Sequence, residues 1–172
     1  CWRSWRNMNT ANPLPATPLP GGFPVASRKL PGSLPEAPPV SVIVNTVDRA
    51  RPLGALLHAL EQQDYRPFEV IVVVGPTQDD TLALLDRYAG RVRVLRCPQA
   101  NLGQSRNIGL LAASGEFVAF IDDDAVPCRT WLRQLVAAFT SPDVALVGGS
   151  VHLVHPEQPA LQHRLGIVSD LG

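Results

Sequence analysis

Short apolar runs alternate with segments of helical periodicity from residue 40 onward. Residues 40–44, 70–74, 92–95 and 117–121 are short runs rich in apolar and β-branched residues, which predict strands. Between these runs, apolar residues recur at three- and four-residue spacing, which predicts amphipathic helices. Such alternation is typical of βαβ units, so we expect an α/β fold with a mostly parallel sheet, flanking helices and right-handed crossovers.

The expected helices have recognisable starts. Pro52 suits a first helical turn, and Thr77 is expected to cap the second helix, with Asp79 and Asp80 in its first turn. The third helix should begin near Gln104. The expected buried positions of the first, third and fourth helices are Leu53, Leu56, Leu57 and Leu60; Ile108, Leu111 and Ala112; and Trp131, Leu132, Leu135, Val136 and Phe139.

One predicted strand runs directly into three carboxylates. Residues 117–121 are apolar, and Asp122, Asp123 and Asp124 follow. The continuous apolar run predicts a central strand buried on both faces, and a further strand is expected at 144–147. Ligands of open α/β sheets bind at the carboxyl ends of the strands. Three adjacent acids there favour a divalent cation, although a solvated acidic turn explains them equally well.

The other strand ends add polar groups to the same expected cleft. Thr46, Asp48 and Arg49 follow the first strand, and Gly75 breaks the second. Because parallel strands end at one edge of a sheet, these residues should meet the acid cluster. The alternatives are that Asp48 only caps the first helix and that Arg49 is only solvated.

Arg106 is expected in the first turn of its helix, where a cation opposes the helix dipole. A diphosphate at that helix start would offset the cost, and a salt bridge to Asp122 or Asp124 would do so equally well. Carboxylate oxygens favour Mg²⁺ or Mn²⁺, with phosphates completing the coordination. Asp122 and Asp124 are expected to face one way and Asp123 the other.

Composition narrows the setting of the protein. Fifteen basic and fifteen acidic residues balance, so net charge indicates nothing about nucleic acid or membrane, and any anion recognition must be local. No nucleic-acid partner is expected. Three widely spaced cysteines indicate no disulfide partner and favour a cytoplasmic location. No apolar run is long enough to span a bilayer, which leaves a peripheral position at the cytoplasmic membrane face open. Residues 1–39, with nine prolines from Pro13 to Pro39, predict a disordered tail.

Four blocks occur in an order known from one enzyme family. They are residues 42–50, 69–74, 101–109 and 115–127, followed by Trp131 and Leu132. On these blocks the chain resembles family 2 glycosyltransferases of the Rossmann-like GT-A fold over about residues 39–149. The resemblance implies that residues 40–172 form an incomplete nucleotide-sugar-binding domain, truncated at its C-terminal end.

The resemblance also implies roles for individual residues. Asp122 and Asp124 match the family's DxD motif, with Asp124 as the metal ligand and Asp122 or Asp123 at the ribose or diphosphate. Thr46 and Asp48 match the first nucleotide-contacting segment, and Arg106 matches an arginine near the donor. These roles imply an inverting, metal-dependent transfer of a sugar from a nucleotide-diphosphate sugar to a saccharide, lipid or other hydroxyl acceptor.

Two departures from the family pattern limit this expectation. The turn at Gly75 replaces the family's acidic pair after the second strand, and Asn45 replaces a proline. Recognition of the nucleotide's base must therefore differ from the family pattern. No residue of the chain is identifiable as the catalytic base. A catalytically inactive nucleotide-sugar-binding remnant is the main alternative function, and a sugar-phosphate nucleotidyltransferase is a weaker one.

Overall fold

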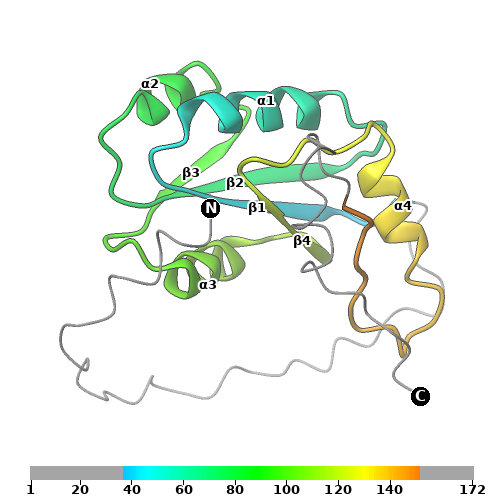
Figure 1. Ribbon diagram of the computed structural model, residues 1–172. Coiled ribbons are helices and arrows are strands. Elements are labelled where there is room, and N and C mark those ends of the chain that lie inside the picture. Colours follow the sequence, from blue (N-terminus) through cyan, green and yellow to red (C-terminus); the bar gives the residue numbers. More distant parts are fainter. Residues whose placement is uncertain (1–36, 152–172) are drawn as a thin grey trace, which may run out of the picture. The chain divides into compact units, whose positions relative to one another are not determined.

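The computed structural model describes residues 37–151 (Figure 1). Four strands, β1 (Val40–Thr46), β2 (Phe68–Val74), β3 (Arg93–Arg96) and β4 (Phe117–Asp122), alternate with four helices, α1 (Ala50–Glu61), α2 (Thr81–Asp86), α3 (Leu102–Ala112) and α4 (Trp131–Ala137). Nearly all of the predicted proline-rich tail and all residues after Val151 lie outside the described residues.

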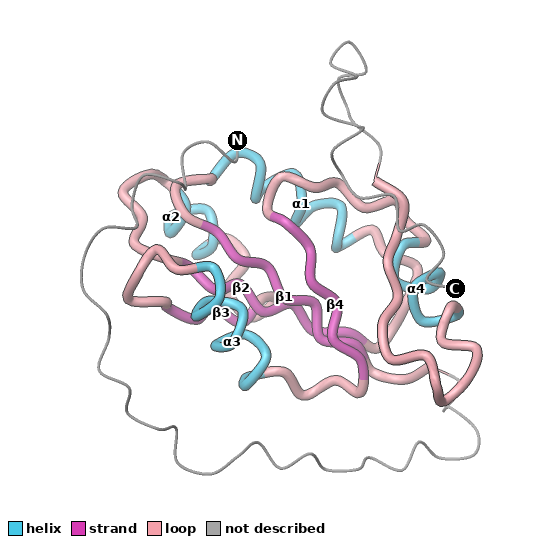
Figure 2. Tube along the Cα trace, turned by 60° about the horizontal axis from the view of Figure 1, so that its bottom comes forward, coloured by secondary structure: helices cyan, strands magenta, loops and turns pink. Residues whose placement is uncertain are grey.

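The four strands form one parallel sheet in the order β3-β2-β1-β4. Figure 2 shows β1 between β2 and β4. Val44 of β1 is level with Val72 on one side and Ile121 on the other. This arrangement confirms the predicted α/β class and its parallel sheet.

The two faces of the sheet are covered by different helices. Even-numbered residues such as Val42 and Val72 pack with α1, α2 and α4, whereas Ile71 and Val73 pack with α3 (Figure 1). The predicted stripe of α1 is confirmed, because Leu53, Leu56, Leu57 and Leu60 are all fully buried. Burial of each such leucine contributes about 2 kcal/mol.

Helix α3 meets the sheet through small residues, and the prediction for Leu111 is wrong. Leu111 is 73% exposed, while Ser105 and Gly109 are buried. A Cβ at Gly109 would lie 2.5 Å from Cγ2 of Ile43, so the helix backbone rests directly on β1. The helix begins at Leu102, earlier than predicted, and helical spacing from Ser105 places Ile108, Gly109 and Ala112 on the contact face.

Strand β4 differs from the predicted central strand. It is an edge of the sheet formed by the described residues, and Val118 and Phe120 are 37% and 46% exposed. Its other face is covered, since Ala119 is buried and the Phe117 ring lies 4.5 Å from that of Phe139. Burial on one face only has a physical cause: α3 packs mainly across β1 and β2 and leaves β4 beside it.

The prediction of a strand at residues 144–147 is wrong as well. These residues lack regular structure, and Leu146 is 87% exposed. An apolar run becomes a strand only where a neighbouring strand takes its backbone hydrogen bonds.

Within residues 37–151, no helix is long and apolar enough to cross a membrane.

Candidate functional site

The carboxyl ends of β1, β2 and β4 lie at the same edge of the sheet. Asn45 is level with Asp122, and Thr46 is level with Val74. The loops after these strands therefore start side by side, as Figure 2 shows for β1 and β4. We call Thr46, Asp48, Arg49, Gly75, Arg106 and the three acids Asp122–Asp124 the strand-end site.

Asp123 is the buried member of the acid cluster. It is 9% exposed, and its Oδ2 accepts a 2.7 Å hydrogen bond from the Thr46 hydroxyl. Burial raises the pKa of Asp123, and the Thr46 hydrogen bond opposes that rise. Thr46, itself buried, thus fixes the orientation of the carboxylate.

Arg49 pairs with two acids of the cluster. Its guanidinium lies 2.9 Å from Oδ2 of Asp124 and 3.9 Å from Oδ1 of Asp123. The alternative that Arg49 is only solvated is therefore wrong. Its position immediately before α1 brings the side chain across from the β1 end to the β4 end.

Arg106 pairs with the remaining acid. Its guanidinium lies 4.0 Å from Oδ1 of Asp122, and both side chains are substantially exposed, at 47% and 80%. Arg106 is the fifth residue of α3, so its predicted place in the first turn is wrong; Asn101 caps that turn by accepting from the N–H of Gln104. The structure thus contains the salt bridge that the sequence left open against a diphosphate contact.

Asp48 does not cap α1. Its Oδ1 accepts from the backbone N–H of Gln78 at 2.6 Å and from the Thr77 hydroxyl at 2.8 Å, so Asp48 holds the loop after β2. The Asp48 backbone has a φ of 50°, a conformation rare for a residue other than glycine. These hydrogen bonds lower the pKa of Asp48.

Asp79, which the sequence placed inside a helix, joins two helix starts instead. Its Oδ2 accepts from the N–H of Ala50 at the start of α1, and its Oδ1 accepts from the N–H of Thr81 at the start of α2, both at 2.9 Å. The prediction that Thr77 caps α2 is wrong, because α2 begins only at Thr81. The signal for this cap was the Asp-x-Thr spacing, since aspartates often accept from the N–H two residues on.

Gly75 allows the two loops to touch. Its N–H donates to the Thr46 carbonyl at 2.9 Å, and a Cβ at this position would lie 2.5 Å from Cγ2 of Val47. A side chain here would separate the loops after β1 and β2. Gly75 therefore shapes the strand-end site through its backbone.

The segment after Asp124 is anchored by Gln63, a buried residue after α1 that the sequence did not single out. Its Nε2 donates to the Cys128 carbonyl at 2.8 Å, and its Oε1 accepts from the N–H of Leu132 at 3.1 Å. Thr130 makes no capping bond through its side chain, so Gln63 supplies the cap of α4. The loop that carries the acids is thus held at both ends, by β4 and by Gln63.

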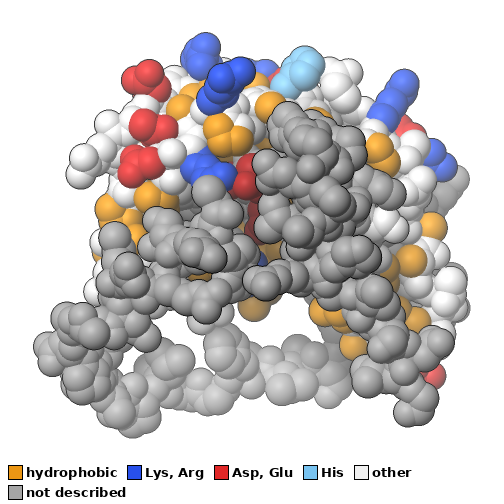
Figure 3. Space-filling model, viewed as in Figure 1, with side chains coloured by type: hydrophobic (Ala, Val, Ile, Leu, Met, Phe, Trp, Pro, Cys, Tyr) orange, Lys and Arg blue, Asp and Glu red, His pale blue; other side chains and the backbone are white. Residues whose placement is uncertain are grey.

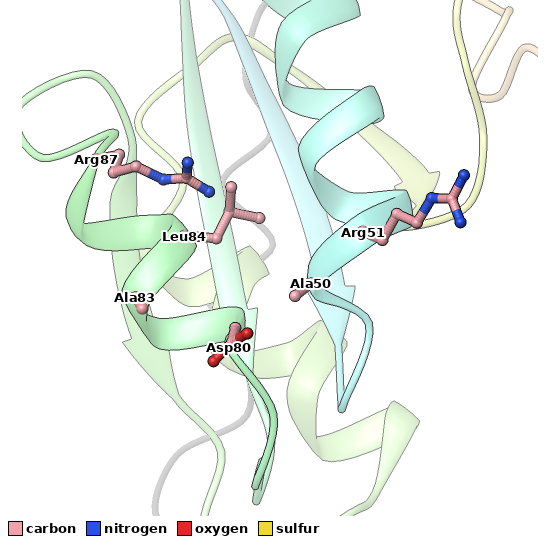
Figure 4. A pocket seen from close by; sticks show the side chains of 6 residues that line it. All are labelled: Ala50, Arg51, Asp80, Ala83, Leu84 and Arg87. Atoms are coloured by element: carbon pink, nitrogen blue, oxygen red, sulfur yellow. The ribbon is translucent and has the colours of Figure 1, made fainter.

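A separate hollow of about 450 Å³ lies between α1 and α2 (Figure 4). It is lined by Ala50, Arg51, Asp80, Ala83, Leu84 and Arg87. None of the β4 acids borders it, so it is not the place where the strand-end groups converge. In Figure 3, acidic side chains gather over the α2 end of this helical layer, and basic side chains lie beside them.

Acid should weaken the link that Asp79 makes. Hydrogen bonds from the Thr81 hydroxyl and the Ala50 N–H lower the pKa of Asp79 from 3.8 to about 2. The ionised carboxylate stabilises the fold fully above pH 3.8, and this contribution is lost as the pH falls toward 2. Urea denaturation between pH 4.5 and 2 should show a steeper loss of stability for the wild type than for Asp79→Asn. Asp80→Asn should keep the wild-type steepness, and equal slopes for wild type and Asp79→Asn would contradict the assignment.

Comparison with solved structures shows that this fold, with its polar groups at the strand ends, is that of glycosyltransferases. The chain aligns with S. aureus TarS residues 1–349 in complex with UDP-GlcNAc at 32% identity and a TM-score of 0.54, covering 58% of this chain and 30% of that one. Alignment with the mannosyltransferase PcManGT from Pyrobaculum calidifontis, in complex with GDP-Man and Mn²⁺, gives 29% identity and a TM-score of 0.59, covering 63% of this chain and 34% of that one.

The chain belongs to glycosyltransferase family 2. The family model described as Glycosyl transferase family 2 matches residues 41–167. A curated relative, glycosyltransferase AglE of Haloferax volcanii, is 31% identical over 125 residues, which are 69% of this chain and 41% of the relative. The chain thus spans less than half the length of AglE. The family and the GT-A-like fold inferred from the sequence are confirmed.

Proposed function

We propose that this chain is the donor-binding part of an inverting, metal-dependent glycosyltransferase that uses a nucleotide-diphosphate sugar. The observation that carries the proposal is the strand-end site, where three acids and two arginines meet at the carboxyl edge of the sheet in a family 2 chain. Related structures in complex with UDP-GlcNAc and with GDP-Man and Mn²⁺ support this class of donor.

The exposed acids suit a hard divalent cation. Asp124 and Asp122 present exposed carboxylate oxygens, which are the donors that Mg²⁺ and Mn²⁺ accept. Within residues 37–151, no group of three or more acidic, histidine or cysteine side chains is arranged to hold an ion by itself. One or two carboxylates are enough when substrate phosphates complete the coordination. When bound, the cation would offset the negative charge that develops on the departing nucleoside diphosphate.

The remaining strand-end residues orient the donor. Thr46 holds Asp123 in place to accept from the ribose or to face the diphosphate. Asp48 and Gly75 fix the loops after β1 and β2, which form the nucleotide side of the site. Arg106 is only loosely paired at 4.0 Å, so its guanidinium retains donors for a diphosphate.

Transfer with inversion requires a base that takes the proton of the acceptor hydroxyl. Within the described residues, the acids at this edge already have other roles: Asp122 and Asp124 toward the cation, Asp123 toward Thr46, and Asp48 and Asp79 in the loops. We therefore assign the base to none of these five acids. The acceptor is a saccharide, a lipid or another hydroxyl compound.

We place the enzyme in the cytoplasm, or peripherally at the cytoplasmic face of a membrane. The support is that Cys97 and Cys128 are free thiols, a state typical of a reducing compartment.

Titration of the chain with UDP, GDP and ADP, with Mn²⁺ and again after EDTA, tests the proposal. At least one nucleoside diphosphate should bind in a Mn²⁺-dependent manner, because its phosphates complete the cation's coordination. Binding that EDTA leaves unchanged, or no binding of any of the three, would contradict it. A full-length protein that binds a nucleotide sugar but never releases the sugar would instead favour the inactive binding module.

A further inference from the structure

Arg49 already places a positive charge beside two of the three acids, Asp123 and Asp124. Its guanidinium contacts Oδ2 of Asp124 at 2.9 Å and approaches Oδ1 of Asp123 to 3.9 Å. Asp124 is one of the two acids that we assign to the metal. A divalent ion coordinated by the Asp124 carboxylate would meet a positive group already bound to the same carboxylate.

The geometry allows Arg49 to leave without disturbing the fold. Its side chain is 34% exposed, and it makes no side-chain cap to α1. Asp79, not Arg49, satisfies the first N–H of that helix. The ion pair with Asp124, whose side chain is 54% exposed, is of the solvent-accessible kind that contributes at most about 1 kcal/mol.

We propose that Arg49 is a placeholder cation: the divalent ion displaces it from Asp124, and the freed guanidinium then binds the diphosphate. The inference rests on the proposed function and adds a coupling mechanism to it. Metal alone leaves Arg49 unpaired next to a like charge, and diphosphate alone faces three carboxylates. Only the two ligands together give every charge a partner, so each should raise the affinity of the site for the other by the same factor.

This exchange of partners gives Arg49 two effects of opposite sign. Without nucleotide, Arg49 competes with the cation, so its removal should tighten metal binding. With nucleotide, Arg49 provides bidentate donors for phosphate oxygens, so its removal should weaken diphosphate binding. A merely structural residue would weaken both.

The experiment measures the Mn²⁺ affinity of the whole chain by calorimetry, once without nucleotide and once with UDP. If the wild type binds another nucleoside diphosphate instead, that nucleotide replaces UDP. Arg49→Gln should bind Mn²⁺ alone about two- to fivefold more tightly than wild type, as expected for loss of a competing surface ion pair. The factor by which the nucleotide raises Mn²⁺ affinity should fall about tenfold, as expected for loss of a charged hydrogen-bond donor. Arg49→Lys keeps the charge and should recover part of that factor.

Arg51→Gln is the matched control. It removes one positive charge two residues away, where Arg51 borders the hollow between α1 and α2 and points away from its centre (Figure 4). It should behave as wild type in both titrations. An unchanged coupling factor in Arg49→Gln, or weaker binding of Mn²⁺ alone, would overturn the placeholder role while leaving the proposed function intact. A wild type without Mn²⁺-dependent nucleotide binding would overturn both.

Discussion

Asp124→Asn should weaken Mn²⁺-dependent binding of a nucleoside diphosphate by about 100-fold or more. Replacing residues that merely orient metal ligands already costs about 10- to 100-fold, and Asp124 is proposed as a ligand itself. Asparagine keeps the shape of the side chain but removes the charge that attracts a hard cation. The effect is measured by titrating the variant with the nucleotide that the wild type binds, in Mn²⁺ and in EDTA.

Folding should not obscure the result of Asp124→Asn. Asp124 is an exposed residue whose side chain forms an accessible ion pair with Arg49, so stability should change by less than about 1 kcal/mol. Asp80→Asn, which removes one negative charge at the start of α2, is the charge-matched control and should bind as wild type does. If Asp124→Asn kept wild-type affinity with its full sensitivity to EDTA, the cation would have to bind elsewhere.

Gly115→Ala should destabilise the fold by about 3 kcal/mol, the upper end of the usual cost of overpacking. A Cβ at Gly115 would lie 2.5 Å from the backbone N and 2.8 Å from the backbone C of the Val40–Ser41 peptide. Strand β1 cannot move away, because β2 and β4 hold it on both sides. Urea denaturation should show a lower midpoint with an unchanged slope.

Gly103→Ala provides a control of opposite sign. Gly103 lies in α3, and a Cβ added there would have the Asn101 side-chain oxygen as its nearest neighbour at 3.5 Å, an ordinary contact. Alanine there should stabilise the chain by about 0.5–1 kcal/mol. Gly115 lies beside the start of β1, whereas the strand-end site lies at the other end of that strand, from its last residue, Thr46, onward. The folded fraction of Gly115→Ala should therefore bind nucleotide normally. If Gly115→Ala were as stable as wild type, the prediction would be wrong, and the turn at Gly115 would be able to relax around the added methyl group.

The elements with strong local patterns were predictable from the sequence. The leucine stripe of α1 and the β-branched residues of β2 each satisfy one geometry only, and both are observed where expected. The acid cluster was also found, because three adjacent acids after an apolar run are a local feature. The alternating exposure of Asp122, Asp123 and Asp124 followed from backbone geometry in the same way.

The partners of the charged side chains could not be read in this way. Asp48 and Asp79 are of a residue type that often caps the nearest helix. Instead, Asp48 holds the loop after β2, and Asp79 caps α1 across 29 residues of sequence. Such contacts depend on which loops the sheet order brings together. The prediction that Leu111 is buried was wrong for a similar reason, because small residues decided which side of α3 faces the sheet.

By itself, the sequence determined the α/β alternation, the parallel sheet and the acids at one strand end, since hydrophobic periodicity and turn chemistry act over a few residues. Only the tertiary structure decided that β4 is an edge of the described sheet, that Gln63 caps α4, and that Arg49 and Arg106 each pair with a different acid. Those outcomes depend on contacts between distant segments, and their energies arise only when the sheet has brought those segments together.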